Sequence, residues 1–125
     1  MPAERALLRQ FLQGGLDAAR FGHRDHVRVA WAMLGPDGMA FHEAYAAYRA
    51  GLVRLTGAAG VPEKFSESQT LDWLALVHES LAATGEASDF IAFEAKAGLH
   101  RRSLADRYPP GRLAAADART GLILP

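Results

Sequence analysis

The chain of 125 residues contains no cysteine, and this absence excludes several kinds of chemistry. Without a thiol there is no disulfide, no thiolate metal site, no iron–sulfur cluster and no cysteine nucleophile. The chain also has no apolar run near the roughly 20 residues that a membrane-spanning helix needs. Its first ten residues, MPAERALLRQ, place charges within the apolar pattern, which is not typical of a signal peptide. We therefore expect a cytoplasmic protein with no membrane partner.

An excess of either charge is also missing, since 14 Lys and Arg residues balance 14 Asp and Glu residues. General nucleic-acid binding rests on excess positive charge, so we expect no nucleic-acid partner. A near-neutral surface tolerates self-association better than a strongly charged one, and a homodimer is therefore one expectation. The sequence has none of the signature loops of nucleotide-binding proteins, serine hydrolases or EF-hands.

Helical periodicity is what the sequence does contain. Apolar residues recur three and four positions apart, and breakers rich in glycine and proline separate the periodic stretches. The spacing predicts helices over about 3–13, 23–34, 39–56, 67–84 and 88–97, a short helix over about 99–107, and one or two helical turns after residue 112. A chain of this length is typical of one domain. The prediction is a single all-α domain over residues 1–125, a compact bundle of five to six helices.

Two histidines stand on the apolar face of the predicted helix 23–34, in the stretch FGHRDHVRVAWAML. At about 100° per residue, His23 and His26 share one arc with Val27, Ala30, Met33 and Leu34. Both lie near the helix N-terminus, where the helix dipole disfavours a protonated imidazole. A neutral imidazole suits a metal ligand or a general base. The alternative is a pair of buried polar groups that find partners in the core and carry no chemistry.

Glu67 is the carboxylate that stands out as a candidate site residue. It stands at the start of the predicted helix 67–84, beside the apolar line that begins at Thr70. With His23 and His26 it would complete either a two-histidine, one-carboxylate set for a divalent metal or a hydrogen-bonded acid/base group. The alternative is a capping box in which Ser66 caps the helix and Glu67 only complements the helix dipole.

Four arginines crowd the region that begins with HRRSLADR, at positions Arg101, Arg102, Arg107 and Arg112. Guanidinium groups bind carboxylates and phosphates through paired hydrogen bonds, so the cluster would suit an anionic substrate. The alternative is the solvated face of a short helix, which is the more common role of such a charge run.

Three fragments together resemble the motifs of a family of small helical bacterial proteins that has no established activity. FGHRDHVRVAWAML resembles F-[ST]-H-x-x-H-[LV]-R-[VL]-A-W, and KFSESQTLDWLALV resembles K-Y-H-E-T-x-T-x-x-W. YPPGRLAAADARTGLILP resembles a C-terminal Y-x-x-x-x-L-x-S-x-x-A-R-x-x-x-x-x-P pattern. The likeness covers residues 21–125 and leaves out the N-terminal helix within residues 1–15.

The resemblance implies a set of polar site positions, which fall on His23, His26, Glu67, Thr70 and Arg119. The chain departs from the family pattern twice. Ser66 stands where the family has a histidine, in the segment Phe65-Ser66-Glu67-Ser68, and Gly22 stands where a Ser or Thr would cap the histidine helix. The loss of that histidine weakens the prediction of a metal site. From these positions and the arginine cluster, the residues predicted to bind substrate are Ser66, Thr70, Tyr108, Arg112 and Arg119.

Three functions fit the sequence. The favoured hypothesis is a small-molecule enzyme or binding protein with His23, His26 and Glu67 as catalytic residues, in a pocket between the helices 23–34 and 67–84. The second is a bundle in which the same three side chains hold a divalent metal. The third is a homodimeric interaction module without a catalytic site, whose apolar surface comes from Phe90, Ile91 and Phe93.

Overall fold

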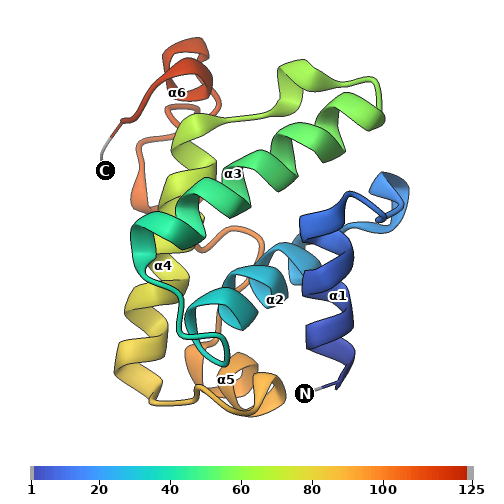
Figure 1. The fold of residues 1–125 in the computed structure, drawn as a ribbon. Coiled ribbons are helices and arrows are strands. Elements are labelled where there is room, and N and C mark those ends of the chain that lie inside the picture. The colour runs from blue at the N-terminus through green and yellow to red at the C-terminus, as the bar shows by residue number, and fades with distance from the viewer. Residues whose placement is uncertain (1, 124–125) are drawn as a thin grey trace.

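A computed structural model describes residues 2–123, with the backbone alone at Pro2 and Ala116, and confirms the all-α prediction. The protein is a compact helical bundle (Figure 1). Its helices in this range are α1 (Pro2–Gln13), α2 (His23–Leu34), α3 (Phe41–Ala58), α4 (Glu67–Thr84), α5 (Phe90–Ala97) and α6 (Ala116–Thr120). Short 3₁₀ turns cover Ala18–Arg20, Pro62–Lys64 and Ala105–Arg107. Leu124 and Pro125, the end of the C-terminal motif, lie outside the described residues.

α2 and α4 form the centre of the bundle. α4 contacts α2, α3, α5 and α6, and α2 contacts α1, α3 and α4. The predicted amphipathic arc of α2 describes its first half, where Arg24 is exposed. In its second half the helix is buried on all sides, and Val29 and Trp31 have no exposed surface. The Trp31 indole N–H donates to the Glu86 carbonyl oxygen at 2.8 Å, which satisfies its buried polar group.

The short helix α5 is held under the bundle by its aromatic residues. Phe90 and Phe93 are fully buried, and the Phe90 ring meets the Trp31 ring edge-on with 5.4 Å between centroids. Of the three residues predicted to form an apolar interaction surface, only Ile91 is exposed, so this surface is not formed. Self-association itself stays a prediction, which light scattering over a range of protein concentrations can test.

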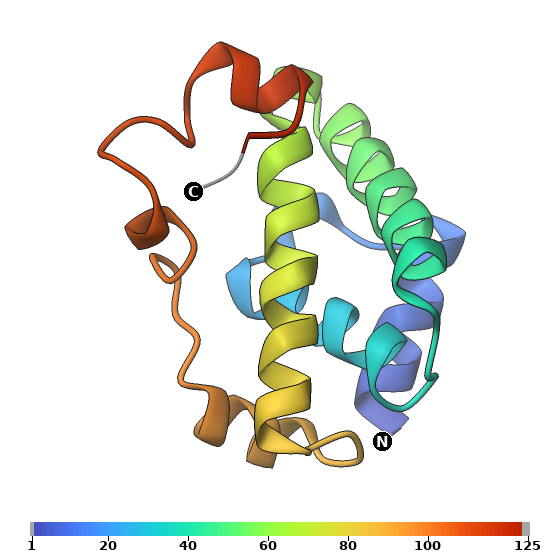
Figure 2. The same ribbon diagram turned by 90° about the vertical axis from the view of Figure 1, so that its left-hand side faces the viewer.

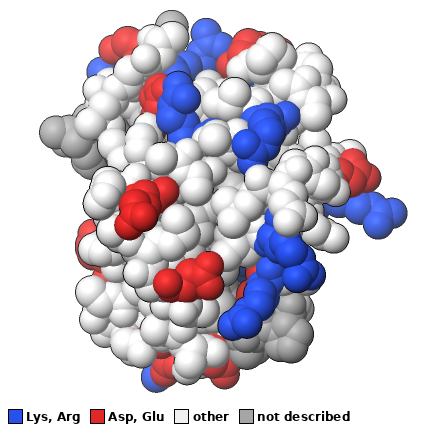
Figure 3. Space-filling model, viewed as in Figure 1, with Lys and Arg blue, Asp and Glu red and all other residues white. Residues whose placement is uncertain are grey.

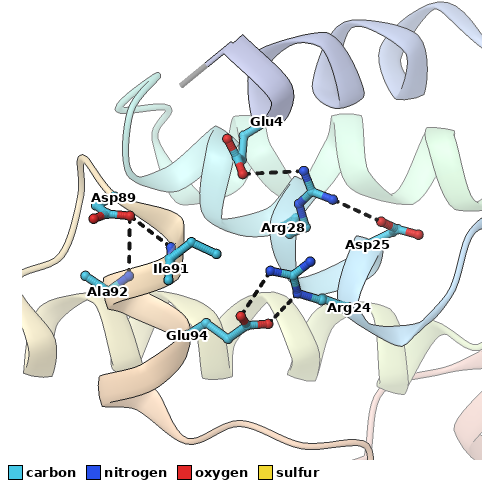
Figure 4. A network of polar contacts seen from close by, with 8 residues as sticks. All are labelled: Glu4, Arg24, Asp25, Arg28, Asp89, Ile91, Ala92 and Glu94. Atoms are coloured by element: carbon cyan, nitrogen blue, oxygen red, sulfur yellow. Dashed lines mark hydrogen bonds and ion pairs between the residues drawn. The ribbon is translucent and has the colours of Figure 1, made fainter.

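Ion pairs tie α1 and α5 to α2 (Figure 4). Arg28 of α2 lies between Glu4 of α1, at 3.4 Å, and Asp25 of its own helix, at 3.6 Å. Arg24 reaches the other way and donates two hydrogen bonds to Glu94 of α5, at 2.6 and 3.1 Å. Glu4 Oε2 and Arg28 Nε are buried and make no hydrogen bond within residues 2–123. The Arg28–Glu4 pair between α1 and α2 is therefore more buried than the Arg24–Glu94 pair between α2 and α5.

Residues 98–115 return along α4 and bring the chain back to the end at which α4 begins (Figure 2). The predicted helix over 99–107 is wrong, because only a 3₁₀ turn forms at Ala105–Arg107. Local bonds compete with the helix: Ser103 Oγ accepts from the His100 N–H at 2.8 Å, and His100 Nδ1 accepts from the Arg102 N–H at 3.2 Å. Together with α6 and the residues after it, the segment builds a second hydrophobic cluster of Leu104, Tyr108, Leu113, Ala118 and Ile123.

The surface carries both charges in small groups. On the face shown in Figure 3, acidic and basic side chains form small groups, some of them next to each other, with wide uncharged areas between the groups. None of the helices within residues 2–123 combines the length and the apolar character that crossing a membrane requires.

Candidate functional site

A cavity of about 330 Å³ opens between the first turns of α2 and α4 and the part of α3 from Tyr48 to Thr56. α2 supplies His23 and His26, and α3 supplies Tyr48. The start of α4 supplies a mainly polar wall that consists of Ser66, Gln69, Thr70 and Trp73. The volume lies near the lower end of the range for small-molecule pockets. A pocket at the predicted place, between the two helices, is therefore present.

His26 presents a neutral imidazole to this cavity. Its ring packs against Phe21 with 4.7 Å between ring centroids, and Tyr48 Oη donates to its backbone oxygen at 3.3 Å. Burial, with a further contribution from His23, lowers the pKa of His26 to about 4, although Asp25 acts in the opposite direction. Neither ring nitrogen hydrogen-bonds to another group within residues 2–123. The imidazole thus keeps a free lone pair near neutral pH, which a general base or hydrogen-bond acceptor needs.

His23 lies one turn before His26 and lines the same cavity. Its ring meets the edge of Trp73 with 5.0 Å between ring centroids. Burial lowers the pKa of His23, and the positive charge of Arg101 and the nearby His100 lower it further. Both histidines therefore face inward and favour the neutral form, as the helix pattern predicts. Burial is the largest cause of the lowered pKa at both His23 and His26.

Glu67 does not reach the histidines. Tyr45 Oη donates to its Oε2 at 2.7 Å, and Arg49 Nε donates to its Oε1 at 2.7 Å. The Arg49 hydrogen bond holds the pKa of Glu67 below its usual range, and burial and the bond to Glu67 raise the pKa of Tyr45 to about 12. The first turn of α4 buries Ser66, Ser68 and Thr70, which leaves Glu67 facing α3. Glu67 joins α3 to α4 and takes no part in the cavity.

The predicted metal set is not assembled. Nowhere in residues 2–123 do three His, Asp or Glu side chains converge closely enough to hold a metal ion. His23 and His26 are neighbours, but the third predicted ligand, Glu67, is bound to Tyr45 and Arg49. The geometry gives no support to a divalent metal held by these three residues.

Ser66 and Thr70 do line the cavity, and both are buried. Ser66 Oγ accepts from the Gln69 N–H at 3.2 Å, which confirms the predicted helix cap, and donates to the Ala118 oxygen at 3.2 Å. Thr70 Oγ1 donates to the Ser66 oxygen at 2.6 Å. Because both hydroxyl protons are used by the backbone, these residues shape the cavity wall and offer a ligand at most an acceptor oxygen.

The other three predicted substrate-binding residues hold the C-terminal segment in place, and none of them lines the cavity. Tyr108 Oη hydrogen-bonds to Asp72 of α4 and lies 3.1 Å from the Ile123 oxygen. Arg112 pairs with Asp117 at 2.7 Å. Arg119 donates to the Glu63 oxygen at 2.8 Å.

Two cations at the cavity were missed as site residues. Lys64 and Arg101 both line it. Arg101 belongs to the predicted arginine cluster, but the structure divides that cluster. Ion pairs join Arg102 to Asp106, Arg107 to Glu79 and Arg112 to Asp117, while Arg101 has no such partner in the described part of the chain. In the sequence, Arg101 is indicated by its membership of the arginine cluster. Lys64 is indicated by its position directly before the Phe65-Ser66-Glu67-Ser68 segment.

No family model, curated protein or solved structure matches this chain.

Acidification is expected to destabilise the protein through His26. The pKa of His26 is about 4 in the fold, below the roughly 6.5 of an unfolded histidine, so between these values only the unfolded chain binds the proton. The stability that the fold has with a neutral His26 is fully present above pH 6.5, and it is lost as the pH falls toward 4. Between pH 7 and pH 4.5 the loss in unfolding free energy should reach about 2.5 kcal/mol.

Urea unfolding of the wild type and of His26→Asn at both pH values isolates this contribution from that of the carboxylates. His42→Asn is the matched control, because His42 is exposed and its loss should leave the acid sensitivity unchanged. Equal losses in the wild type and in His26→Asn would show that His26 is not the cause.

Proposed function

We propose that this protein is a small-molecule enzyme or binding protein whose site is the cavity between the first turns of α2 and α4. The supporting observation is the His26 imidazole, which is partly buried, favours the neutral form and has no hydrogen-bond partner in the described residues. The His26 ring nitrogens keep some exposed surface, because the buried side-chain atoms without a partner within residues 2–123 are Glu4 Oε2 and Arg28 Nε, so a molecule in the cavity can reach them. A ligand in the cavity would supply the missing partner.

The roles of the surrounding residues follow from their positions. His26 would accept a proton or a hydrogen bond from the ligand, and His23 would contact the same ligand one helical turn away. Aromatic rings of Phe21, Phe65 and Trp73 line the cavity and offer apolar contact area. The Gln69 side chain, which also lines the cavity, provides amide donors and an acceptor that would fix the orientation of the ligand.

A ligand screen by NMR tests this proposal. The full chain is mixed with a library of small metabolites, and the ring signals of the histidines and the indole N–H signals of Trp31 and Trp73 are followed. We expect hits that shift His26 and Trp73 while Trp31, which is fully buried away from the cavity, does not move.

The variant His26→Asn should weaken the binding of these hits, and His42→Asn should not. Urea unfolding of both variants at pH 7.5 checks that each is folded. The proposal fails if no compound shifts the cavity signals, or if the hits bind His26→Asn as tightly as the wild type.

A further inference from the structure

We propose that the cavity selects a small organic anion, with an apolar or aromatic body and one carboxylate or phosphate group. This inference rests on the proposed function, because it assigns a ligand class to the same cavity. The residues that would hold the anionic group are Lys64 and Arg101.

The charge of the cavity lining differs from that of the whole chain. Acidic and basic residues are balanced 14 to 14 over the sequence, yet the residues that line the cavity include Lys64 and Arg101 and no Asp or Glu. Four acids are sequence neighbours of lining residues, and none of them lines the cavity. Glu67 is bound by Arg49, Asp72 is bound by Tyr108, and Asp25 accepts from the Gly22 N–H at 3.1 Å. Glu63, next to Lys64, is exposed. The lining therefore carries a net positive charge while both histidines are neutral.

These two cations are also free to bind. The side chains of Lys64 and Arg101 make no hydrogen bond or ion pair within residues 2–123, whereas Arg102, Arg107 and Arg112 are each paired with a carboxylate. An anion at Arg101 needs no existing ion pair to break. A guanidinium can hold a carboxylate or phosphate through two parallel hydrogen bonds, and Lys64 would add a point charge.

The rest of the cavity determines the size and the apolar character of the ligand that fits. A volume of about 330 Å³ suits a small metabolite rather than a polymer. Phe21, Phe65 and Trp73 present aromatic surface, so an apolar or aromatic body gains contact area there. The neutral imidazole of His26 has one N–H group, which would donate a hydrogen bond to an oxygen of the bound anion.

Four probes of matched shape test the ligand class: benzoate, phenyl phosphate, benzamide and benzylamine. Each is titrated into the full chain, and the Trp73 indole signal reports binding, with Trp31 as the internal reference. We expect benzoate or phenyl phosphate to bind about tenfold tighter than benzamide, with benzylamine weakest, since a charged hydrogen bond contributes at least that much. The ranking of the two anions then tells whether a carboxylate or a phosphate is preferred.

Three variants locate the anionic group. Arg101→Gln and Lys64→Gln should each weaken binding of the preferred anion about fivefold to tenfold and leave benzamide unchanged. Arg102→Gln is the matched control, because Arg102 is the next residue, is paired with Asp106 and does not line the cavity. All three side chains are exposed, so the unfolding free energy should stay close to that of the wild type.

The two proposals fail in different ways. If benzamide or benzylamine binds as tightly as the anions, or if Arg102→Gln weakens binding as much as Arg101→Gln, the assignment of an anionic ligand is overturned while the cavity remains a binding site. If none of the four probes binds, the anionic class is likewise overturned, and the wider library decides the proposed function.

Discussion

Gly51→Ala is expected to destabilise the protein by roughly 3 kcal/mol, near the upper end of the penalties for over-packing a core. A Cβ at Gly51 of α3 would lie 2.2, 2.3 and 2.8 Å from three ring atoms of Phe11 in α1. The Phe11 ring has little room to move, because only 2% of its surface is exposed and it is held by Phe21 and Tyr48, with ring centroids at 5.7 and 6.0 Å. The absent side chain is what lets α1 approach α3.

Urea unfolding of two matched variants tests this explanation. Gly57→Ala lies in the same helix and its added Cβ meets nothing within 4 Å, so it should stabilise the protein by up to about 1 kcal/mol. Phe11→Leu in the Gly51→Ala background should recover part of the loss, because the smaller side chain frees space for the methyl group. If Gly51→Ala is as stable as the wild type, the close contact between α1 and α3 is wrong.

The same substitution should reach the candidate site. Phe21 and Tyr48, the two rings that hold Phe11, both line the cavity. Any shift of Phe11 in Gly51→Ala therefore displaces a cavity wall, and ligands found in the screen should bind this variant more weakly even where it remains folded.

Arg28→Met is expected to destabilise the protein by roughly 4 kcal/mol, as happens when one partner of a buried ion pair is removed. The side chains of Arg28 and Glu4 are only 19% and 8% exposed, and Glu4 Oε2 already lacks a partner within residues 2–123. Without Arg28, the Glu4 carboxylate would be left buried without a compensating charge. Thermal or urea unfolding measures the loss.

A neighbouring pair on the same helix gives the control. Arg24 and Glu94 are closer together, at 2.6 Å, but their side chains are 53% and 38% exposed, so Arg24→Met should change the unfolding free energy by no more than about 1 kcal/mol. The double variant Glu4→Met/Arg28→Met should be more stable than Arg28→Met, because it removes the uncompensated charge. If Arg28→Met is as stable as Arg24→Met, burial does not determine how much stability is lost when the arginine of an ion pair is removed.

The helices that could be predicted closely are those whose ends carry strong local signals. The bounds of α2 and α4 agree with the prediction at both ends. α4 starts at the Ser66 cap and ends at Gly85, whose φ of 69° suits a glycine C-cap. Ser88 and Asp89 both suit an N-cap, but Asp89 is the one that accepts from the Ile91 and Ala92 N–H groups, so α5 begins at Phe90 and not at the start of the predicted range 88–97. Two adjacent capping residues cannot be told apart without knowing which face of the helix is buried.

The candidate site was predicted where it depends on one helix, and missed where it depends on several. The inward direction of His23 and His26 follows from the periodicity of α2 alone. The direction of Glu67 depends on α3, since Tyr45 and Arg49 stand four residues apart and meet it together. The place of Arg101 depends on the irregular return of the chain along α4, which helical periodicity does not describe.

Trp73 connects the cavity to the C-terminal segment, where a second signal can report ligand binding. Its indole packs against both the main core and the C-terminal cluster that contains Tyr108 and Ile123, and it also lines the cavity. The segment after α5 is mostly turns, so its amides should exchange with solvent through local openings that leave α2 and α4 intact. A compound that seats against Trp73 is expected to make those openings rarer. The buried Ile123 amide donates to Ser68 Oγ at 2.8 Å. Although Ile123 does not line the cavity, slower hydrogen exchange at this amide would then show that a ligand is bound there.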